Sequence, residues 1–213
     1  INVVRKAADL QSTLLQPSTS TLTSAQALSI SWGIHNFGNG RSNASAWYDG
    51  FWLSSDQQLD SSDVWLGDVY HSGFVDSGAD YGGISNFALP IDLDGDFYVI
   101  QRVDHYNDVT EFDGEANNSF VSATRVHVTR AVVPDLNVSV VVPAATRLVN
   151  TQSFDVSWRV GNAGEAATDS GWYDSVYLSL DRQFDAHSDI FLGYLPRLRN
   201  LQPGQSYDAS GSF

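Results

Sequence analysis

The chain has 213 residues, a formal net charge of −14 and no cysteine. The acidic excess argues against binding to nucleic acid or anionic membranes, which need basic patches, and the absence of cysteine excludes disulfides and thiolate metal sites. No apolar run reaches the roughly 18 residues that membrane insertion requires. The hydrophobic content of 42% is enough for packed cores, and the length suits one large domain or two of about 100 residues.

Short runs of alternating apolar and polar residues follow one another along the chain and predict β-strands. The expected strands include Leu28–Ile34, Phe97–Val103, Phe120–Val128, Leu136–Val142 and Phe154–Val160. Turn sequences such as FGNGRSN, DLDGD and LQPGQ separate the runs, and no stretch of about 11 residues has a helical period. The sequence therefore predicts an all-β fold of the sandwich type.

A constant spacing relates the two halves of the chain. Trp158 follows Trp32 at 158 − 32 = 126 residues, and the segment Trp47–Asp49 returns as Trp172–Asp174 after a slip of one residue. A unit of this length is too long for a solenoid repeat. The spacing therefore predicts two copies of one domain in tandem.

The same spacing defines the expected domain boundaries. We expect residues 9–132 to form a complete β-sandwich, and residues 133–213 to form a second one that stops before its final strands. The opening INVVR matches VHVTR at Val126–Arg130. Residues 1–8 are therefore expected to contain the last strand of a preceding repeat and a linker.

The motifs PDLNVSVVVP, VSWRVGNAGEA, WYDSVYLSLD, DIFLG, FYVIQRVD and NDVTEFDGEANN resemble those of the CARDB domain, the cell-adhesion-related domain found in bacteria. The resemblance covers nearly the whole chain. It implies tandem immunoglobulin-like sandwiches within a large secreted or cell-surface protein. Neighbouring repeats, other copies of the polypeptide, surface proteins or glycans are the partners that it implies.

Two equivalent turns with three aspartates each are candidate calcium sites. They contain Asp56, Asp60 and Asp63 in the first copy, and Asp181, Asp185 and Asp189 in the second. Calcium prefers several carboxylate and carbonyl oxygens from a flexible loop. The alternative is a polar hairpin whose Asp side chains accept hydrogen bonds from nearby backbone N–H groups.

The densest acidic stretch follows the strand expected at Phe97–Val103. Its candidate calcium ligands are Asp104, Asn107, Asp108, Glu111, Glu115 and Asn118. These acids repel one another unless water, salt or a cation relieves the repulsion. A long solvated hairpin held by Asn and Asp hydrogen bonds to the backbone is the alternative.

Aromatic residues near the repeated WYD segment are candidates for sugar binding, with Tyr48, Trp52 and Trp65 as the platform. Partial burial against a neighbouring sheet or domain is the alternative. Asp49 lies among them. Because an isolated buried carboxylate is costly, we expect Asp49 to be hydrogen-bonded to the backbone or to a neighbouring side chain.

No constellation of catalytic residues stands out, and we expect no enzymatic activity. Two Asp-Ser-Gly segments, which begin at Asp76 and Asp169, fall in non-equivalent turns and do not match the carboxylate pair of an aspartic protease. The resemblance therefore implies an extracellular adhesive or structural segment, and the acidic loops suggest that calcium stabilises it. A building block of an extracellular filament and a carbohydrate-binding accessory module of a secreted enzyme are the alternatives.

Overall fold

The computed structural model describes residues 5–144, 147, 149, 152–198 and 200–213. These residues form 13 β-strands and one short 3-10 helix, so the predicted all-β class is confirmed. Contacts divide the chain into unit 1 (Ile1–Ala131) and unit 2 (Val132–Phe213). The strand expected at the start of the chain falls mainly on residues 1–4, which lie outside the described residues. None of the described residues forms a helix that is long and apolar enough to span a membrane.

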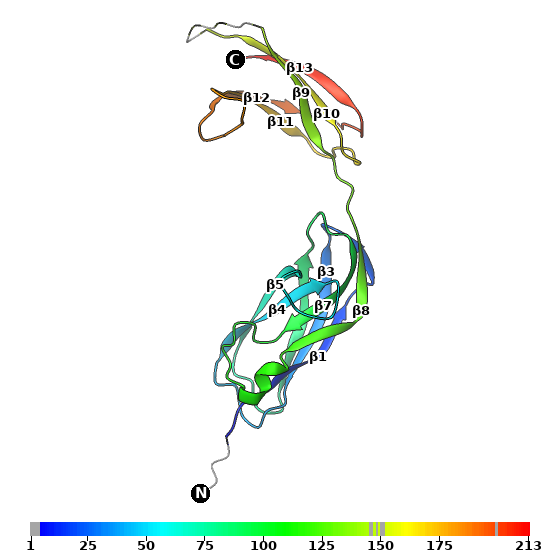
Figure 1. The fold of residues 1–213 in the computed structure, drawn as a ribbon, viewed down its shortest axis with the longest axis vertical. Coiled ribbons are helices and arrows are strands. Elements are labelled where there is room, and N and C mark those ends of the chain that lie inside the picture. Colours follow the sequence, from blue (N-terminus) through cyan, green and yellow to red (C-terminus); the bar gives the residue numbers. More distant parts are fainter. Residues whose placement is uncertain (1–4, 145–146, 148, 150–151, 199) are drawn as a thin grey trace. The chain divides into compact units, whose positions relative to one another are not determined.

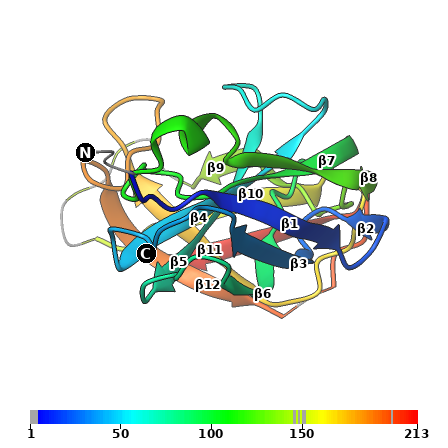
Figure 2. The ribbon, with the colours of Figure 1, turned by 90° about the horizontal axis from the view of Figure 1, so that it is seen from below.

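Unit 1 consists of two sheets (Figure 1). The first is antiparallel and contains β1 (Leu10–Pro17), β3 (Ala27–Asn36) and β6 (Asp80–Ala88) in that order. The second contains, in spatial order, β2 (Thr21–Thr23), β8 (Ser119–Thr129), β7 (Gly95–Arg102), β4 (Ala46–Ser54) and β5 (Val64–Ser72). The helix η1 (Phe112–Ala116) lies in the segment between β7 and β8. Figure 2 shows β1 beside β3, as their pairing requires.

The described part of unit 2 has a three-stranded and a two-stranded sheet. The first contains β9 (Leu136–Pro143), β10 (Asp155–Asn162) and β13 (Ser206–Ser212), with β10 in the centre. The second contains β11 (Trp172–Leu178) and β12 (Ile190–Arg197). Both sheets are antiparallel.

The strand pairing repeats between the units residue by residue. Trp32 of β3 lies opposite Leu15 and Gly83. Trp158 of β10 lies opposite Val141 and Ala209, each 126 residues further on. Likewise, Trp47 pairs with His71 and Trp172 with Arg197. Both tryptophan pairs therefore occupy equivalent strand positions, as the spacing in the sequence predicts.

The core of unit 1 lies between its two sheets. The alternation in β3 buries Leu28, Ile30, Trp32 and Ile34, and each such side chain contributes about 1.5–3 kcal/mol on burial. Across the sandwich, the ring of Trp32 meets that of Phe51 from β4 at 5.9 Å. Unit 2 has a smaller cluster around Val156, Trp158 and Val160, because fewer described strands cover it.

One buried amide closes the same loop in each unit. Asn36 accepts the N–H groups of Asp9 and Gly38 and donates to the carbonyl oxygens of Gly40 and Val75. Asn162 makes the equivalent four bonds, with Asp135, Gly164, Ala166 and Leu201 as partners.

Glycine is required beside this amide. A Cβ atom on Gly38 would collide with the carbonyl oxygen of Ala7, and one on Gly164 would collide with that of Val133. The close approach of the preceding segment therefore leaves no room for a side chain at either position. The two glycines lie at the same place in the repeat, so both units use the same solution.

Candidate functional site

The two Asp-rich turns have the same hydrogen bonds in both units. Asp56 Oδ1 accepts the N–H of Gln58 at 2.7 Å, and Asp181 Oδ1 accepts that of Gln183 at 2.7 Å. One oxygen of Asp63 binds the N–H of Asp60 at 2.9 Å. The pair Asp189 and Asp185 repeats this bond at 2.9 Å. These carboxylates organise the turn backbone, as the polar-hairpin alternative expects. A role for them in calcium binding stays a prediction.

The acidic loop after β7 separates its candidate ligands into buried and exposed ones. Asp104, Glu111 and Asn118 are buried, Glu115 is half-buried, and Asn107 and Asp108 are exposed. Among the expected ligands, Asn118, Glu115 and Asp104 lie near enough to Glu111 to act on its pKa. Among the described residues, no group of three or more His, Cys, Asp or Glu side chains has the arrangement of a metal site.

Asp104 acts as the organiser of this loop. It has a positive φ of 47°, and its two carboxylate oxygens accept the N–H groups of Asp108 and Val109 at 2.9 and 2.8 Å. Burial raises the pKa of Asp104, although these two N–H groups act against the rise. The carboxylate thus holds a tight turn that few residues adopt without such support.

Glu111 connects the loop to the first sheet. Its Oε1 accepts the N–H of Leu10 at 2.8 Å, and its own N–H donates to Glu115 at 2.8 Å. Burial raises the pKa of Glu111 to about 7, and the charge of Glu115 adds to the rise. The Asn118 side chain acts on the Glu111 carboxyl group and works against the rise of its pKa, but neither Glu111 Oε2 nor Asn118 Oδ1 has a partner at hydrogen-bond distance among the described residues. Two such oxygens are suitable ligands for a hard cation.

An aspartate occupies the equivalent strand position in each unit, buried in unit 1 and half-buried in unit 2. Asp49 is fully buried, and its Oδ1 accepts the N–H of Asp104 at 2.9 Å and the hydroxyl of Tyr81 at 3.3 Å. The expected hydrogen bonds to backbone and side chain are confirmed. Burial raises the pKa of Asp49 to about 7, because these bonds offset only part of the desolvation.

In unit 2 the equivalent acid is Asp174, which shares the tyrosine partner but has different other partners. It accepts hydrogen bonds from Trp158 at 2.8 Å, from Tyr207 at 2.8 Å and from Arg197 at 2.7 Å. Burial alone would raise the pKa of Asp174, but these bonds, that from Arg197 first, lower it below its ordinary value. Arg197 occupies the position that His71 has in unit 1.

The predicted aromatic platform lies on the outer face of β4 and β5. Tyr48 and Trp65 are exposed, whereas Trp52 is buried beneath neighbouring rings. The rings of Trp52 and Trp65 meet at 62° with centroids 4.6 Å apart, so these two do not form a flat stacking surface. Tyr70 extends the exposed face beside Tyr48, at 5.2 Å between centroids. A ligand site at the three predicted residues stays a prediction.

Unit 2 presents aromatic residues on the same face. Tyr173 is the counterpart of Tyr48, and Phe191 is that of Trp65. Both are exposed, as is Tyr194, whose ring meets that of Tyr173 at 86° and 5.0 Å. Tyr173, Ser175 and Tyr194 line a shallow open hollow. The outer face of β4 and β5 in unit 1 and that of β11 and β12 in unit 2 are therefore both aromatic.

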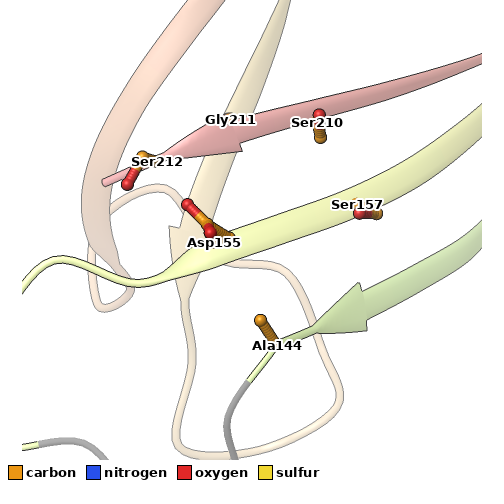
Figure 3. A pocket seen from close by; sticks show the side chains of 6 residues that line it. All are labelled: Ala144, Asp155, Ser157, Ser210, Gly211 and Ser212. Carbon is orange, nitrogen blue, oxygen red and sulfur yellow. The ribbon is translucent and has the colours of Figure 1, made fainter.

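A second hollow in unit 2 is polar (Figure 3). Its lining consists of Ala144, Asp155, Ser157, Ser210, Gly211 and Ser212. The paired ends of β10 and β13 supply most of these residues, with Asp155 opposite Ser212. One carboxylate and several hydroxyl groups form no recognisable catalytic arrangement.

The sequence did not indicate Asp9, Tyr81 and His71 as part of these sites. Asp9 accepts a hydrogen bond from Asn117 at 3.0 Å and so ties the acidic loop to the segment before β1. Tyr81 binds both Trp47 and Asp49. Asp9 and Tyr81 each have an identical counterpart 126 residues later, in Asp135 and Tyr207. This recurrence is the sequence feature that could have indicated a role for Asp9 and Tyr81.

The comparisons with known proteins give a limited result. No family model and no curated protein matches the sequence. A similar solved structure is the CARDB domain of the PF1109 protein from Pyrococcus furiosus, which was crystallised in complex with di-metal ions. The TM-score is 0.43 and the sequence identity is 15%, and the match covers 61% of this chain and 100% of that domain. A solution structure of the same domain has a TM-score of 0.42 and 13% identity, with 59% and 98% covered. Red sea bream transglutaminase has a TM-score of 0.30 and 10% identity over 100% of this chain and 27% of that enzyme. TM-scores below 0.5 carry no argument about ligands or activity.

Proposed function

We propose that the chain is a non-enzymatic adhesive segment of an extracellular protein, built from CARDB-type sandwiches, whose contact surface is the outer aromatic face. The observation that carries the proposal is the recurrence of exposed rings on β4 and β5 and on β11 and β12. Tyr48 and Trp65 in unit 1 correspond to Tyr173 and Phe191 in unit 2. Clustered exposed aromatic residues are typical of protein and glycan contact sites.

The buried acids support a structural rather than a catalytic role. Asp104 and Glu111 use carboxylate oxygens to accept backbone N–H groups, and Asp49 does the same. A catalytic acid has to reach a substrate in a cleft. The hydrogen bonds of these three acids instead hold the acidic loop against the two sheets.

Adhesion can be measured with beads coated with the full chain, because other copies of the chain are the first partner that we propose. We expect the beads to cluster, and the double substitution Tyr48→Ser and Tyr173→Ser to abolish clustering. Ile84→Ser is the matched control, because Ile84 is an exposed apolar residue of β6, on the other sheet. Clustering that survives the double substitution, or that Ile84→Ser reduces equally, would contradict the proposed contact face.

A carbohydrate-binding module is the second candidate, and the hollow lined by Tyr173, Ser175 and Tyr194 favours it. An aromatic ring beside a hydroxyl group suits the apolar face and the hydroxyls of a sugar. Binding of the chain to a glycan array, lost on Tyr194→Ser, would favour this candidate. A chain that binds no glycan but clusters beads supports adhesion between copies.

We further propose that calcium binds in the acidic loop, with Glu111 and Asn118 among its ligands. The two buried oxygens that lack hydrogen-bond partners support this position, and binding would stabilise the fold by mass action. We expect calcium to raise the melting temperature of the full chain relative to chelator. Glu111→Gln should remove the difference, whereas the exposed Asp108→Asn should keep it. Equal melting temperatures with calcium and chelator would refute the site.

A further inference from the structure

The outer face of β4 in unit 1 carries two opposite charges. Gly50 of β4 pairs with Asp68 of β5 on one side and with Arg102 of β7 on the other. Residues paired in this way point to the same face, and the backbones of Asp68 and Arg102 lie about 10 Å apart, since neighbouring strands are about 5 Å apart. Both side chains are exposed, and Tyr106 donates its hydroxyl to Asp68 at 3.4 Å. Unit 2 has Tyr194 at the position of Asp68, so it does not repeat this acid.

Gly50 allows aromatic rings to lie between these charges. A Cβ atom there would be 2.6 Å from the ring of Trp52 and 3.2 Å from that of His105, so both rings occupy the space above the glycine. Burial first, and then the charge of Arg102, lower the pKa of His105, while the charge of Asp68 opposes them. The ring of His105 therefore lies within reach of both charges. Such a surface suits a partner that presents a cation, an anion and an apolar side chain together.

The turn after β11 in unit 2 presents these three kinds of side chain. Asp181 and Arg182 are adjacent and exposed, and Leu180 is 106% exposed. None of the ion pairs among the described residues includes Arg182. Asp181 uses Oδ1 to accept the N–H of Gln183, so its Oδ2 is available to a cation. A fully exposed leucine beside two exposed charges is typical of a contact site rather than of a solvated turn.

The corresponding turn of unit 1 lacks two of these features. Ser55 stands at the position of Leu180, and Gln57 stands at that of Arg182. Ser55 is exposed as well, so the exposure of this position belongs to the turn itself and not to the smaller number of strands in unit 2. The acid on the outer face thus occurs in unit 1 alone, and the apolar and basic turn occurs in unit 2 alone.

We propose that the turn after β11 of one copy of the chain binds the outer face of β4 and β5 in unit 1 of a second copy. Arg182 then pairs with Asp68. Asp181 pairs with Arg102, and Leu180 packs against the exposed rings. The net charge of −14 on each copy acts against association, but salt screens charges that lie further apart than about 8 Å. This contact rests on the proposed adhesion between copies and specifies the segment of each copy that takes part.

A contact between two different surfaces leaves one surface free on each end of a dimer, so association is open-ended. The test uses two variants of the full chain. In the turn variant, Leu180→Ser and Arg182→Gln give unit 2 the residues that unit 1 has at these positions. The face variant is Asp68→Arg. Sedimentation at several concentrations, in chelator, measures association.

We expect the unchanged chain to form oligomers that grow with concentration, and each variant alone to associate at least about tenfold more weakly. An equal mixture of the two variants should form dimers and nothing larger. The reason is that the intact face of the turn variant accepts the intact turn of the face variant, whereas the other two surfaces are both altered. Asp92→Arg is the matched control and should not change association, because Asp92 is exposed in the turn between β6 and β7.

Three outcomes would overturn the proposal. Oligomers that neither variant weakens, or variants that do not combine in the mixture, would refute this contact and leave adhesion through the aromatic face standing. A chain that stays monomeric while Arg182→Gln alters the NMR signals of unit 1 would place the contact within one chain. A chain that neither forms oligomers nor clusters beads would refute the proposed adhesion between copies together with this contact.

Discussion

The equivalent aspartate is buried in unit 1 and half-buried in unit 2, and the residue beside it differs between the units. In unit 1, Asp49 lies opposite a strand that contributes His71, and burial raises the pKa of the acid to about 7. In unit 2, Arg197 occupies the position of His71 and donates to Asp174 at 2.7 Å, and the pKa of this acid is lowered. The deeper burial of Asp49 and the hydrogen bonds of Asp174, that from Arg197 first, together give the two acids opposite pKa shifts.

This difference shows that the residues that hold the loop of each unit can stay the same while the ionisation of the central aspartate changes. The amide of Asn36 or Asn162 and the glycine beside it are identical in both units. The electrostatics of the central acid are not, because both its burial and its neighbouring side chains differ between the units. Substitutions at the shared amide should therefore act alike in the two units, and substitutions around the acid should not.

The largest expected effect concerns the shared amide. Asn36→Ala removes four hydrogen bonds and leaves buried backbone groups unpaired, which should lower the free energy of unfolding of unit 1 by about 5 kcal/mol. Asn162→Ala should destabilise unit 2 to a similar extent. Hydrogen exchange of the full chain resolves the two units. The exposed Asn39→Ala is the control and should have a much smaller effect. Markedly unequal losses would show that the framework is not shared.

The second prediction concerns pH. Above about pH 4, an unfolded Asp49 loses its proton, whereas the folded one keeps it up to about pH 7. Unfolding then releases a proton, so the stability of unit 1 should fall by about 3 kcal/mol as the pH rises from about 4 to about 7. Glu111, whose pKa is also raised to about 7, acts in the same direction.

Unit 2 should respond in the opposite sense. The lowered pKa of Asp174 means that its contribution is present above about pH 4 and is lost as the pH falls through its folded value. Hydrogen exchange at several pH values, in chelator, measures both units in one sample. Asp49→Asn should flatten the profile of unit 1 and leave that of unit 2 unchanged. Parallel profiles in the two units would contradict the assignment.

The third prediction concerns Arg197 in unit 2 and its counterpart His71 in unit 1. Arg197→Ala leaves Asp174 without its cation, and unit 2 should lose about 2 kcal/mol at neutral pH, less than for a fully buried pair because Arg197 is partly exposed. His71→Arg should lower the pKa of Asp49, measured by NMR titration of its carboxyl carbon. Arg159→Ala, which breaks an exposed pair with Asp208, is the control and should cost little. An unchanged titration of Asp49 would mean that the position opposite Trp47 does not control its charge.

Much of this comparison was predictable from the sequence. The spacing of 126 residues placed Trp32 and Trp158 on equivalent strands, because strand alternation and turn residues recur with it. The acidic loop was less predictable. Glu111 accepts the N–H of Leu10, which lies far away in the sequence. Asp104 accepts the N–H of Val109 in a turn that depends on the positive φ of Asp104. Neither feature leaves a local pattern, so residue type alone could not separate buried acids from the exposed Asn107 and Asp108.

The smallest expected effect concerns the turns, where the units are alike again. Asp56 and Asp181 each accept one backbone N–H at 2.7 Å, so Asp56→Ala and Asp181→Ala should each cost about 0.5–1 kcal/mol, and equally. The bond requires no cation, and the same losses should therefore appear in calcium and in chelator. Melting of the full chain under both conditions decides between the two roles of these turns. If either substitution removed a stabilisation that only calcium provides, the carboxylates would be ligands as well as turn acceptors, and the turns would join the acidic loop as calcium sites.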